Sequence, residues 1–340
     1  MPTVRQVAEQ AGVSISTVSL ALNDKPGVSE EMRARVQEAF RQLEREESTD
    51  QSNRSSDQKR RNQTSLSVVI LHPGILRSSQ VFSEFLQGIE AGAISHNIQL
   101  RLVVNEVALP RDHVHQLYFL DPKLYPDGVL VLGDRTEVPL PDHIYDLDIP
   151  VVLVGRISDD YRLSAIGRDE EGIAYQATNY LLSLGHQAIA FIGGELSFQY
   201  THHRLNGYKL ALRETLGEFP ERWIALGDGS QAAREILANS PEITAVLFIN
   251  DAYAEESLPV FQERGKRIPD DLSVISFDYT NFAQTHDPPL TSIAYHRFDE
   301  GLQAMKRLVE MIRNPKLKFC QDILNAKLIK NASCKPVKTG

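Results

Sequence analysis

The sequence predicts an all-α N-terminal head and an α/β body of two doubly wound parallel-sheet lobes, joined by a polar linker. Three observations lead to this fold class. In the first 45 residues, apolar side chains recur at spacings of three and four, which is the period of an amphipathic helix. Residues 46–65 contain no apolar side chain apart from threonine methyls. From residue 66 onward, short apolar runs alternate with helical patterns, which is typical of parallel sheets covered on both faces.

Three short helices are expected in the head, residues 1–45. The first has one apolar face, made by Val4, Val7, Ala8 and Ala11. Gly12 can take the positive φ that ends this helix, and Ser14 can cap the next one. The second and third helices have apolar faces of their own, made by Ile15, Val18, Ala21 and Leu22 and by Val36, Ala39, Phe40 and Leu43. Ser29 is expected to cap the third helix, so the head is predicted to be a helix-turn-helix unit.

Residues 46–65 are predicted to be a solvated linker, because their composition offers nothing to bury in a core. The densest basic run nearby is KRR at residues 59–61. Contact with DNA phosphates is one interpretation of this run, and a solvated charge cluster is the favoured one.

Seven apolar runs of the body are predicted to be β-strands: Val68–Leu71, Leu100–Val104, Gly128–Leu132, Val151–Val154, Ala188–Ile192, Ala245–Ile249 and Leu272–Phe277. Six amphipathic segments are predicted to be helices: 80–96, 170–184, 201–216, 230–238, 253–265 and 297–313. Two doubly wound units fit these ~270 residues better than one. The polar stretch 155–165 is the expected boundary between the two lobes.

Composition and charge narrow the class of protein. The 340-residue chain is 42% hydrophobic and 24% charged, so it can bury a sizeable core. Residues 1–65 contain ten Lys and Arg and ten Asp and Glu, so the formal charge of −9 lies entirely in the body. This negative charge argues against a protein that binds nucleic acid over a broad basic surface. It is compatible with a local DNA-binding site in the head, because charges further away than about 8–10 Å are screened.

The two cysteines, Cys320 and Cys334, have no spacing that fits a metal site. Reduced thiols of a cytoplasmic protein are therefore expected. The sequence contains no run of 18 apolar residues and no apolar signal segment near its start. Neither membrane insertion nor secretion is expected.

Sequence strings along the whole chain resemble one family. The N-terminal string VRQVAEQAGVSISTVSLALN, followed by KPGVSEEMRARVQEA, resembles the head of the LacI family of bacterial transcriptional regulators, the LacI/GalR-type repressors. Six strings of the body follow in the family's order: Pro150–Arg156, Gly185–Gly194, Arg204–Leu212, Ala245–Asp251, Leu272–Asp278 and Pro289–Ile293. The resemblance covers nearly the full length apart from residues 46–65.

The resemblance implies a homodimeric, ligand-controlled transcription regulator, with a body that resembles periplasmic sugar-binding proteins. The helix-turn-helix DNA-binding domain would be residues 1–45, the polar linker 46–65, and the effector-binding and dimerisation body 66–334. The chain would cross between the lobes three times. By analogy with the family, the N-lobe would comprise 66–163 plus 291–314, and the C-lobe 164–290 plus 315–334.

The expected partner of the head is double-stranded operator DNA in the form of an approximate palindrome, because a two-fold dimer presents two heads. Ser16, Thr17 and Leu20 are expected to face base edges in the major groove, where Leu20 would contact a thymine methyl. Other positions match family residues that hold phosphates. The full set expected at DNA is Thr3, Val4, Ser14, Ile15, Ser16, Thr17, Ser19, Leu20, Asn23 and Ser29. A three-helix bundle that contacts protein is the alternative for the head.

The resemblance also assigns seven residues to a small-molecule effector site between the lobes: Phe82, Arg156, Asp169, Arg204, Asn250, Asp251 and Asp278. Phe82 would stack on the effector, Arg204 would donate to its oxygens, and Asp278 would accept from its hydroxyls. A helix-core position for Phe82, a surface salt bridge for Arg204 and a helix N-cap for Asp278 are the alternatives. Gly155 stands where the family often has an acidic residue, which would change the choice of effector.

A sugar is the leading effector class, and a nucleobase or a protein co-regulator is the alternative. No cofactor, metal ligand or catalytic residue is assigned, because GxSxG, Walker A, HExxH and CxxC patterns are all missing. A solute-binding transport protein would fit the body alone, but the head argues against it. The sequence therefore predicts a repressor rather than an enzyme.

The linker departs from the family pattern, and this generates a prediction. The family's Tyr-x-Pro-Asn string and the hinge helix that wedges an apolar residue into the minor groove have no counterpart after Leu43. Bound operator is therefore expected to be kinked less at its centre than with a typical family member. A circular-permutation gel measures the bend, and a sharp central bend would contradict the prediction.

Overall fold

The computed structural model describes a defined part of the chain. The described residues are 4–14, 17–18, 21, 28–29, 32–39, 42, 66–72, 79–104, 126–132, 149–157, 163–317 and 319–337. The chain divides into two compact units, Met1–Ser65 and Leu66–Gly340. The second unit begins at the residue where the sequence places the start of the body.

The first unit contains the predicted helical core. Helix α1 spans Val4–Ala11, and residues 32–39 are also helical. The buried apolar side chains of this unit come from three segments of the sequence, and they are Val7, Ala8, Ala11, Val18, Ala21, Val36 and Ala39. Gly12 has a φ of +64°, so it ends α1 in the left-handed region as predicted.

Side-chain to backbone hydrogen bonds hold the turns of the head. The Ser14 hydroxyl accepts from the Thr17 amide at 3.1 Å, and the Ser29 hydroxyl accepts from the Met32 amide at 3.3 Å, so both predicted caps are confirmed. Two arginines add bonds that the sequence did not predict. Arg35 donates to the Ala11 carbonyl at 2.7 Å, and Arg33 donates to the Ala21 carbonyl at 3.0 Å.

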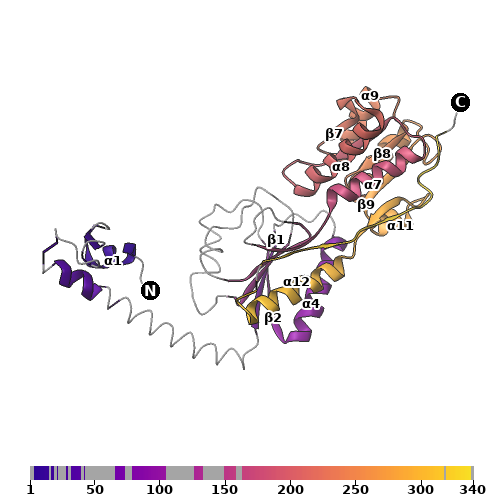
Figure 1. The fold of residues 1–340 in the computed structure, drawn as a ribbon. Helices are drawn as coiled ribbons and strands as arrows, with labels where there is room; N and C mark the ends of the chain where they lie inside the picture. The colour runs from indigo at the N-terminus through magenta and orange to yellow at the C-terminus, as the bar shows by residue number, and fades with distance from the viewer. Residues whose placement is uncertain are drawn as a thin grey trace. The chain divides into compact units, whose positions relative to one another are not determined.

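The second unit contains two six-stranded sheets (Figure 1). The first sheet has the order β11-β5-β4-β3-β1-β2, and each described pairing in it is parallel. Its strands are β1 Leu66–His72, β2 Ile98–Val104, β3 Gly128–Leu132, β4 Val151–Val154, β5 Ser164–Arg168 and β11 Gln321–Leu324. Strands β3, β4 and β5 are almost wholly buried, as expected for the centre of a parallel sheet.

The second sheet has the order β12-β10-β9-β8-β6-β7. Its strands are β6 Ile189–Gly193, β7 Ile224–Leu226, β8 Ala245–Phe248, β9 Ser273–Asp278, β10 Thr291–Ala294 and β12 Lys327–Ile329. The pairings are parallel except for that of β12, which runs antiparallel to β10. The predicted class of two doubly wound parallel-sheet lobes is confirmed.

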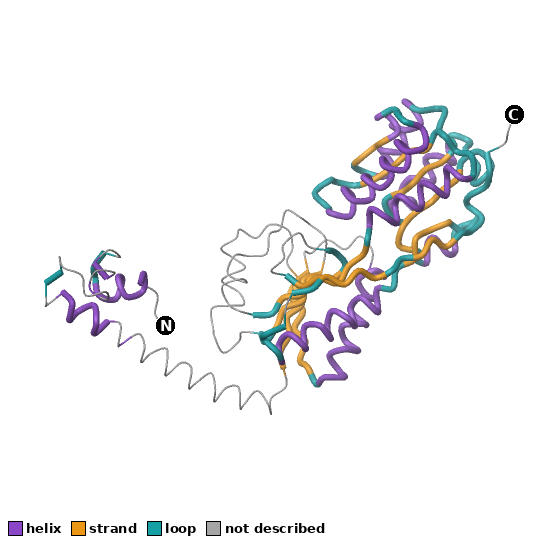
Figure 2. Tube along the Cα trace, viewed as in Figure 1, coloured by secondary structure: helices purple, strands orange, loops and turns teal. Residues whose placement is uncertain are grey.

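Helices pack against both sheets (Figure 2). Helices α4 Ser79–His96 and α12 Arg297–Arg313 lie side by side against the first sheet. The second sheet is accompanied by α7 Glu170–Ser183, α8 Gln199–Leu216, a short 3-10 helix at Glu221–Trp223, α9 Gly229–Asn239, α10 Asp251–Glu263 and α11 Asn281–Thr285. All seven predicted strands and all six predicted helices of the body are present within about two residues.

The structure corrects the lobe boundaries that the sequence suggested. Strand β5 and strand β11 belong to the first sheet, although residues 164–290 and 315–334 were assigned to the C-lobe. Strand β10 belongs to the second sheet, although residues 291–314 were assigned to the N-lobe. The segments Ser164–Arg168 and Gln321–Leu324 contain polar residues and lack the continuous apolar run that identified the other strands, so the sequence did not reveal them as strands.

The chain passes between the two sheets three times, as the resemblance implied. The first passage follows Arg168, the second follows Ala294, and the third follows Leu324. Two of these passages lead directly into a helix, α7 and α12. Charged side chains at the starts of these helices therefore lie where the two lobes meet.

Glycines allow close helix pairs on both sides of this junction. A Cβ at Gly207 of α8 would overlap the Glu171 carbonyl of α7, and a Cβ at Gly301 of α12 would overlap the Phe85 carbonyl of α4. Backbone cannot shift away as a flexible side chain can, so glycine is needed at both positions. The contact at Gly207 sets the distance between α7 and α8, which carry residues of the site described below.

The Arg35 bond to Ala11 generates a prediction for the head. Arg35→Met removes a hydrogen bond to the last turn of α1, and the expected loss is about 1 kcal/mol of local stability. Amides of residues 4–11 should then exchange with deuterium about five times faster in the full-length protein. Gln37→Met, on the exposed face of the same helix, is the matched control. Equal exchange in the two variants would contradict a tie between the helices.

Candidate effector and DNA-binding sites

The described part of the head includes three of the side chains that the sequence places at DNA. Ser14 and Ser29 are exposed, and Thr17 is half-buried. The Ser14 and Thr17 hydroxyls lie 2.8 Å apart within hydrogen-bond reach of each other. Val4 lies in the first turn of α1. The remaining predicted residues lie outside the described residues, and they are Thr3, Ile15, Ser16, Ser19, Leu20 and Asn23.

A buried cluster of charged side chains occupies the first and second passages between the sheets. Arg168 stands at the end of β5, and Glu170 begins α7. Glu170 lies between two guanidinium groups: its Oε1 is 3.5 Å from Arg168 Nε, and its Oε2 is 2.7 Å from Arg204 Nε. The Tyr295 hydroxyl also donates to Glu170 Oε2, at 2.9 Å.

The surroundings of Glu170 keep it ionised. Burial alone would raise the pKa of this carboxyl, but the charges of Arg204 and Arg168 and the hydrogen bonds from Arg204 and Tyr295 outweigh burial and lower it to about 2. A carboxylate that meets two guanidinium groups and a phenol is held in place as well as ionised. Glu170 is therefore a fixed negative charge at the junction of the lobes.

Arg204, which the sequence predicts to bind effector, is held by protein groups through all three nitrogens. Its Nε donates to Glu170, its Nη1 to the Ile249 carbonyl, and its Nη2 to the Tyr295 hydroxyl at 3.0 Å. The guanidinium lies 4.3 Å from the centre of the Phe277 ring. Arg204 is 3% exposed, so the alternative of a surface salt bridge is wrong, and the arginine forms a buried ion pair instead.

A second ion pair ties the lobes through Asp278. The Arg297 Nη2 donates to Asp278 Oδ1 at 2.6 Å, and Arg297 Nη1 lies 3.3 Å from Glu84 of α4. Asp278 has a φ of +101°, which is a strained conformation for a residue with a side chain. The N-cap of α11 is Thr280, so Asp278 is not a helix cap. The Arg297 guanidinium group at the start of α12 therefore contacts both the end of β9 and α4.

Glu300 is the least satisfied charged group of the junction. It lies in the first turns of α12, is fully buried, and neither of its carboxyl oxygens has a hydrogen-bond partner. Its nearest cation is Arg168, whose Nε is 3.6 Å from Oε2. Burial raises the pKa of Glu300 to about 7, although Arg168 and Arg297 oppose the shift. The carboxyl therefore changes its charge in the neutral pH range.

Asn250 and Asp251 serve the local fold in this structure. Asn250 caps α10 by accepting from the Tyr253 amide at 3.0 Å. The buried Asp251 carboxylate accepts from the Ser276 and Ser292 hydroxyls and from the amide and hydroxyl of Thr280. Burial and the nearby charge of Asp278 raise the pKa of Asp251 to about 6. Asp251 thus links β9, β10 and the start of α10.

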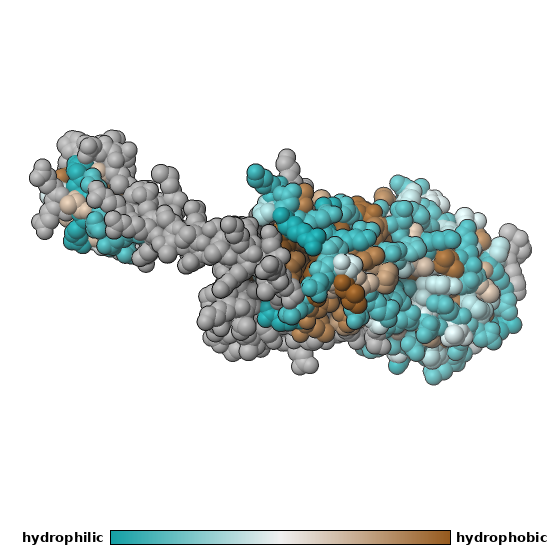
Figure 3. All heavy atoms as spheres, turned by 90° about the horizontal axis from the view of Figure 1, so that it is seen from below, coloured by the Kyte–Doolittle hydropathy of each residue, from teal (hydrophilic) through white to brown (hydrophobic). Residues whose placement is uncertain are grey.

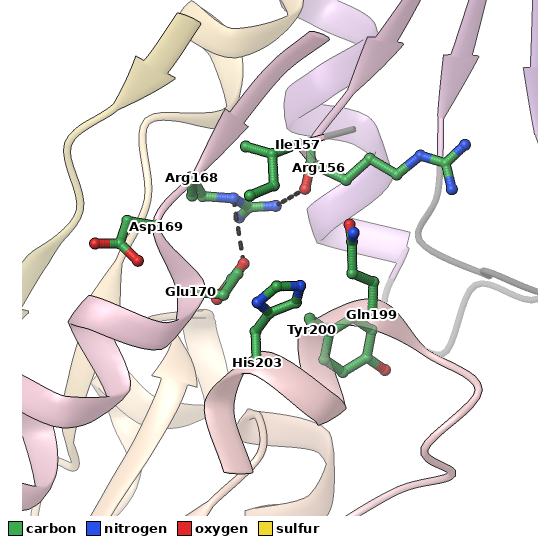
Figure 4. Close-up of a pocket in the computed structure, with 9 residues that line it drawn as sticks. Arg156, Ile157, Arg168, Asp169, Glu170, Gln199, Tyr200 and His203 are labelled. Carbon is green, nitrogen blue, oxygen red and sulfur yellow. Dashed lines mark hydrogen bonds and ion pairs between the residues drawn. The ribbon is translucent and has the colours of Figure 1, made fainter. Parts of the chain in front are cut away.

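A small pocket opens beside the charged cluster (Figure 4). It is lined by Gly155, Arg156, Ile157, Arg168, Asp169, Glu170, Gln199, Tyr200 and His203. Its volume is about 20 Å³, which is room for about one water molecule. In Figure 4, Glu170, Gln199, Tyr200 and His203 gather around one space, and the Arg156 guanidinium points away from it. A sugar would need this pocket to widen.

The remaining predicted effector residues are spread around this junction. Asp169 is exposed and caps α7 by accepting from the Gly172 amide at 2.7 Å. Phe82 is half-buried and packs against the core of the first sheet, and it lines neither of the two pockets described here. The second pocket, of about 330 Å³, is lined by the first turns of α4 and α12, the end of β9, α11 and the end of β10, and it includes Asp278 and Arg297.

Sequence reasoning missed the partners of Arg204. It did not predict Glu170, Arg168, Tyr295, Arg297 or Glu300 as members of the site. One signal was present: Glu300 precedes Ala304 by four residues and Leu308 by eight, so it falls on the apolar face of α12. A charge on a buried helix face points to a buried partner, and that partner is Arg168.

The described residues hold no group of three or more His, Cys, Asp or Glu side chains arranged to bind a metal ion. Among the same residues, no helix combines the length and apolar character that crossing a bilayer requires.

Two family models match the chain. The model "Bacterial regulatory proteins, lacI family" matches residues 3–44, and "Periplasmic binding protein-like domain" matches residues 178–334. The transcriptional repressor CytR of Escherichia coli strain K12 is 30% identical over 339 residues, covering 96% of this chain and 94% of CytR. The chain belongs to the lacI family of bacterial regulatory proteins. The family predicted from the sequence strings is confirmed.

Other relatives of this lacI-family regulator are also transcription regulators rather than enzymes. Catabolite control protein A of Priestia megaterium is 29% identical over 320 residues, covering 91% of this chain and 92% of that protein. The regulator CelR in complex with cellobiose matches with a TM-score of 0.72 at 25% identity, over 98% of this chain and 100% of CelR. A LacI family regulator from Enterococcus faecium with bound ribose matches with a TM-score of 0.68 at 25% identity, over 80% of this chain and 100% of that one.

Glu300 generates a prediction for the pH dependence of stability. Its pKa is raised to about 7 in the folded protein, so its contribution to stability is complete below its unfolded-state pKa of about 4.3 and is lost as the pH rises through about 7. Glu300→Gln keeps the shape and cannot ionise. The variant should therefore be more stable than the wild type at pH 8, by about 4 kcal/mol at most, and this gain should shrink toward pH 5.

Urea denaturation of the full-length protein between pH 5 and pH 8 measures this difference. Glu90→Gln, on the exposed side of α4, removes the same charge from the surface and is the control. A Glu300→Gln effect that is the same at every pH would show that Glu300 does not titrate in this range.

Proposed function

We propose that this regulator is a repressor whose affinity for operator DNA is modulated by a small molecule bound between the two lobes of the body. The observation that carries the proposal is the position of Arg204. Its guanidinium lies where the chain passes between the lobes, beside a pocket with polar walls from α7 and α8. A ligand there contacts both lobes, and it therefore favours one arrangement of the lobes over another.

The proposed ligand is a sugar. The polar groups around the pocket, such as Gln199, Tyr200 and His203, suit hydroxyls, and two structural relatives are complexes with cellobiose and with ribose. A nucleobase is the second candidate, favoured by the aromatic rings of Tyr200 and Tyr295 near Arg204. The proposed effector residues are Phe82, Arg156, Asp169, Arg204, Asn250, Asp251 and Asp278. Arg204 and Asp278 reach a ligand with hydrogen-bonding capacity beyond the bonds that they make here. Asp251 acts by positioning β9.

The proposed DNA-reading unit is a homodimer. Two heads on one two-fold axis read the two halves of an approximate palindrome. Exposed apolar side chains on α4 and β2 suit a subunit contact: Ile94 is 74% exposed and Leu102 is 46% exposed. Figure 3 shows apolar surface on the side of the body where these two elements lie. Operator binding places the regulator in the cytoplasm and needs no cofactor.

The proposed coupling is modest in energy. A ligand that shifts the lobes with a coupling free energy of about 1–3 kcal/mol changes operator affinity roughly 5–150-fold. We propose that the ligand weakens operator binding. If no small molecule produces this change, a protein co-regulator is the remaining source of control.

Fluorescence anisotropy of a selected operator, titrated with the full-length protein and a panel of sugars and nucleobases, tests this function. One panel member should weaken binding within the range given above. Asp278→Asn should bind the operator and lose the ligand response, because a neutral amide has one accepting oxygen in place of a charged carboxylate with two. Asp299→Asn, exposed at the start of α12, is the control and should keep the response. A ligand response that survives in Asp278→Asn would contradict the proposed site.

A further inference from the structure

Two buried guanidinium groups belong to the charged cluster beside the pocket, and such groups ordinarily attract anions. Arg168 lines the pocket, and Arg204 binds the pocket residue Glu170. Arg168 is 9% exposed and Arg204 is 3% exposed. Guanidinium groups bind carboxylates and phosphates through paired hydrogen bonds, so two of them would suit a sugar phosphate or an acid. The class of ligand that binds here therefore depends on whether other protein groups already neutralise the charges of Arg168 and Arg204.

The charge of both arginines is already opposed inside the protein. Glu170 lies between them, at 3.5 Å from Arg168 and 2.7 Å from Arg204. Glu300 adds a second carboxyl 3.6 Å from Arg168. Asp169 and Arg156 also line the pocket, but in Figure 4 both of their charged groups point away from the space, so neither one decides its charge. An anionic ligand would thus meet Glu170, a fixed negative charge, beside the two guanidinium groups.

We propose that Glu170 is the specificity-determining residue of the effector site, a built-in anion that makes the site select neutral, hydroxyl-rich ligands and reject phosphorylated or carboxylated ones. This inference rests on the proposed function, because it names the class of ligand for the same pocket. A hydroxyl both donates and accepts, so it satisfies a carboxylate and a guanidinium side by side. A phosphate or carboxylate oxygen only accepts, and Glu170 repels it.

Glu170 is held too firmly to move aside for an anion. Its two oxygens meet Arg168, Arg204 and the Tyr295 hydroxyl, and the Tyr295 ring lies 4.2 Å from the Arg168 guanidinium. The backbone contact at Gly207 fixes α7 against α8, which carries Arg204. Displacing Glu170 would break these bonds together and leave a buried charge without its partners.

Hydrogen-bonding capacity remains on the cluster for a neutral ligand. Arg204 Nη1 and Nη2 each carry two N–H groups, and each has one hydrogen bond to the protein. Gln199 and His203 of α8 line the same space. A ring of hydroxyls can meet Gln199 and His203 while the carboxylate of Glu170 accepts from it, and it reaches the Arg204 donors when the pocket widens.

Inorganic phosphate is the probe that tests the proposal, with the full-length protein and its thermal unfolding as the readout. The wild type should show no saturable stabilisation by phosphate. Glu170→Gln keeps the shape and removes the charge, so it should bind phosphate at least roughly tenfold more tightly than the wild type. Glu171→Gln, the next residue of α7, removes the same net charge and should behave as the wild type. The double variant Glu170→Gln, Arg204→Met should lose the gain.

Each outcome decides the proposal. Saturable phosphate binding by the wild type, or a gain in Glu171→Gln equal to that in Glu170→Gln, would overturn it. If Glu170→Gln fails to fold, the test uses the wild type alone. Its binding is then compared for two matched pairs of ligands, ribose with ribose 5-phosphate and glucose with glucose 6-phosphate. A phosphorylated member that binds the wild type more tightly than its neutral partner overturns the proposal, and the absence of such binding supports it. If the wild type does not bind operator DNA, the proposed function is refuted. The phosphate results would still decide the role of Glu170, because they do not depend on DNA.

Discussion

The buried pairing of Glu170 with Arg204 and Arg168 is the constraint on which the centre of the body depends. An arginine that is 3% exposed cannot leave its charge unmatched, because an isolated buried charge costs several kcal/mol. Glu170 supplies the counter-charge from the first turn of α7, directly after the chain leaves the first sheet. The passage between the lobes is thereby fixed by a charge pair rather than by apolar packing.

This choice of interaction suits the proposed control by a ligand that shifts the lobes. The apolar cores of the body's described residues lie within the lobes: one cluster packs around the second sheet, and two clusters pack against the first. Among the described residues, the contacts that connect the lobes include ion pairs and hydrogen bonds, such as Arg297 with Asp278 and Gln80 with the Asn281 amide. Polar partners can be exchanged for ligand atoms of similar chemistry, whereas a shared apolar core would resist separation. A ligand between the lobes therefore acts on the contacts that are easiest to rearrange.

The sequence predicted most of the fold, because the strands at the centre of each sheet are continuous apolar runs such as Val151–Val154. It missed strands β5, β7, β10, β11 and β12, which are short or partly polar and become strands only through pairing with distant segments. It also misplaced the lobe boundaries, because a polar segment such as Ser164–Arg168 can be a buried strand once its neighbours cover it.

The sequence predicted only part of the candidate site, because its residues are also brought together from distant segments of the chain. Arg204 and Asp278 were recognised by their place in family strings, but their partners were not. Glu170 lies 34 residues before Arg204 in the sequence, and Tyr295 lies 91 residues after it. No local pattern reports such pairs, since the passages between sheets bring them together. In the head, the caps at Ser14 and Ser29 were predicted because a cap is a local interaction within three residues.

The central claim is that this lacI-family regulator binds a two-fold symmetric operator and that a ligand in the body changes this binding. The most direct measurement is a footprint of the full-length protein on DNA of its own genome, with and without a saturating neutral sugar. The account predicts two protected half-sites related by approximate symmetry, with weaker protection when the ligand is present. Absence of any protected symmetric site, at protein concentrations that saturate non-specific DNA, would contradict it.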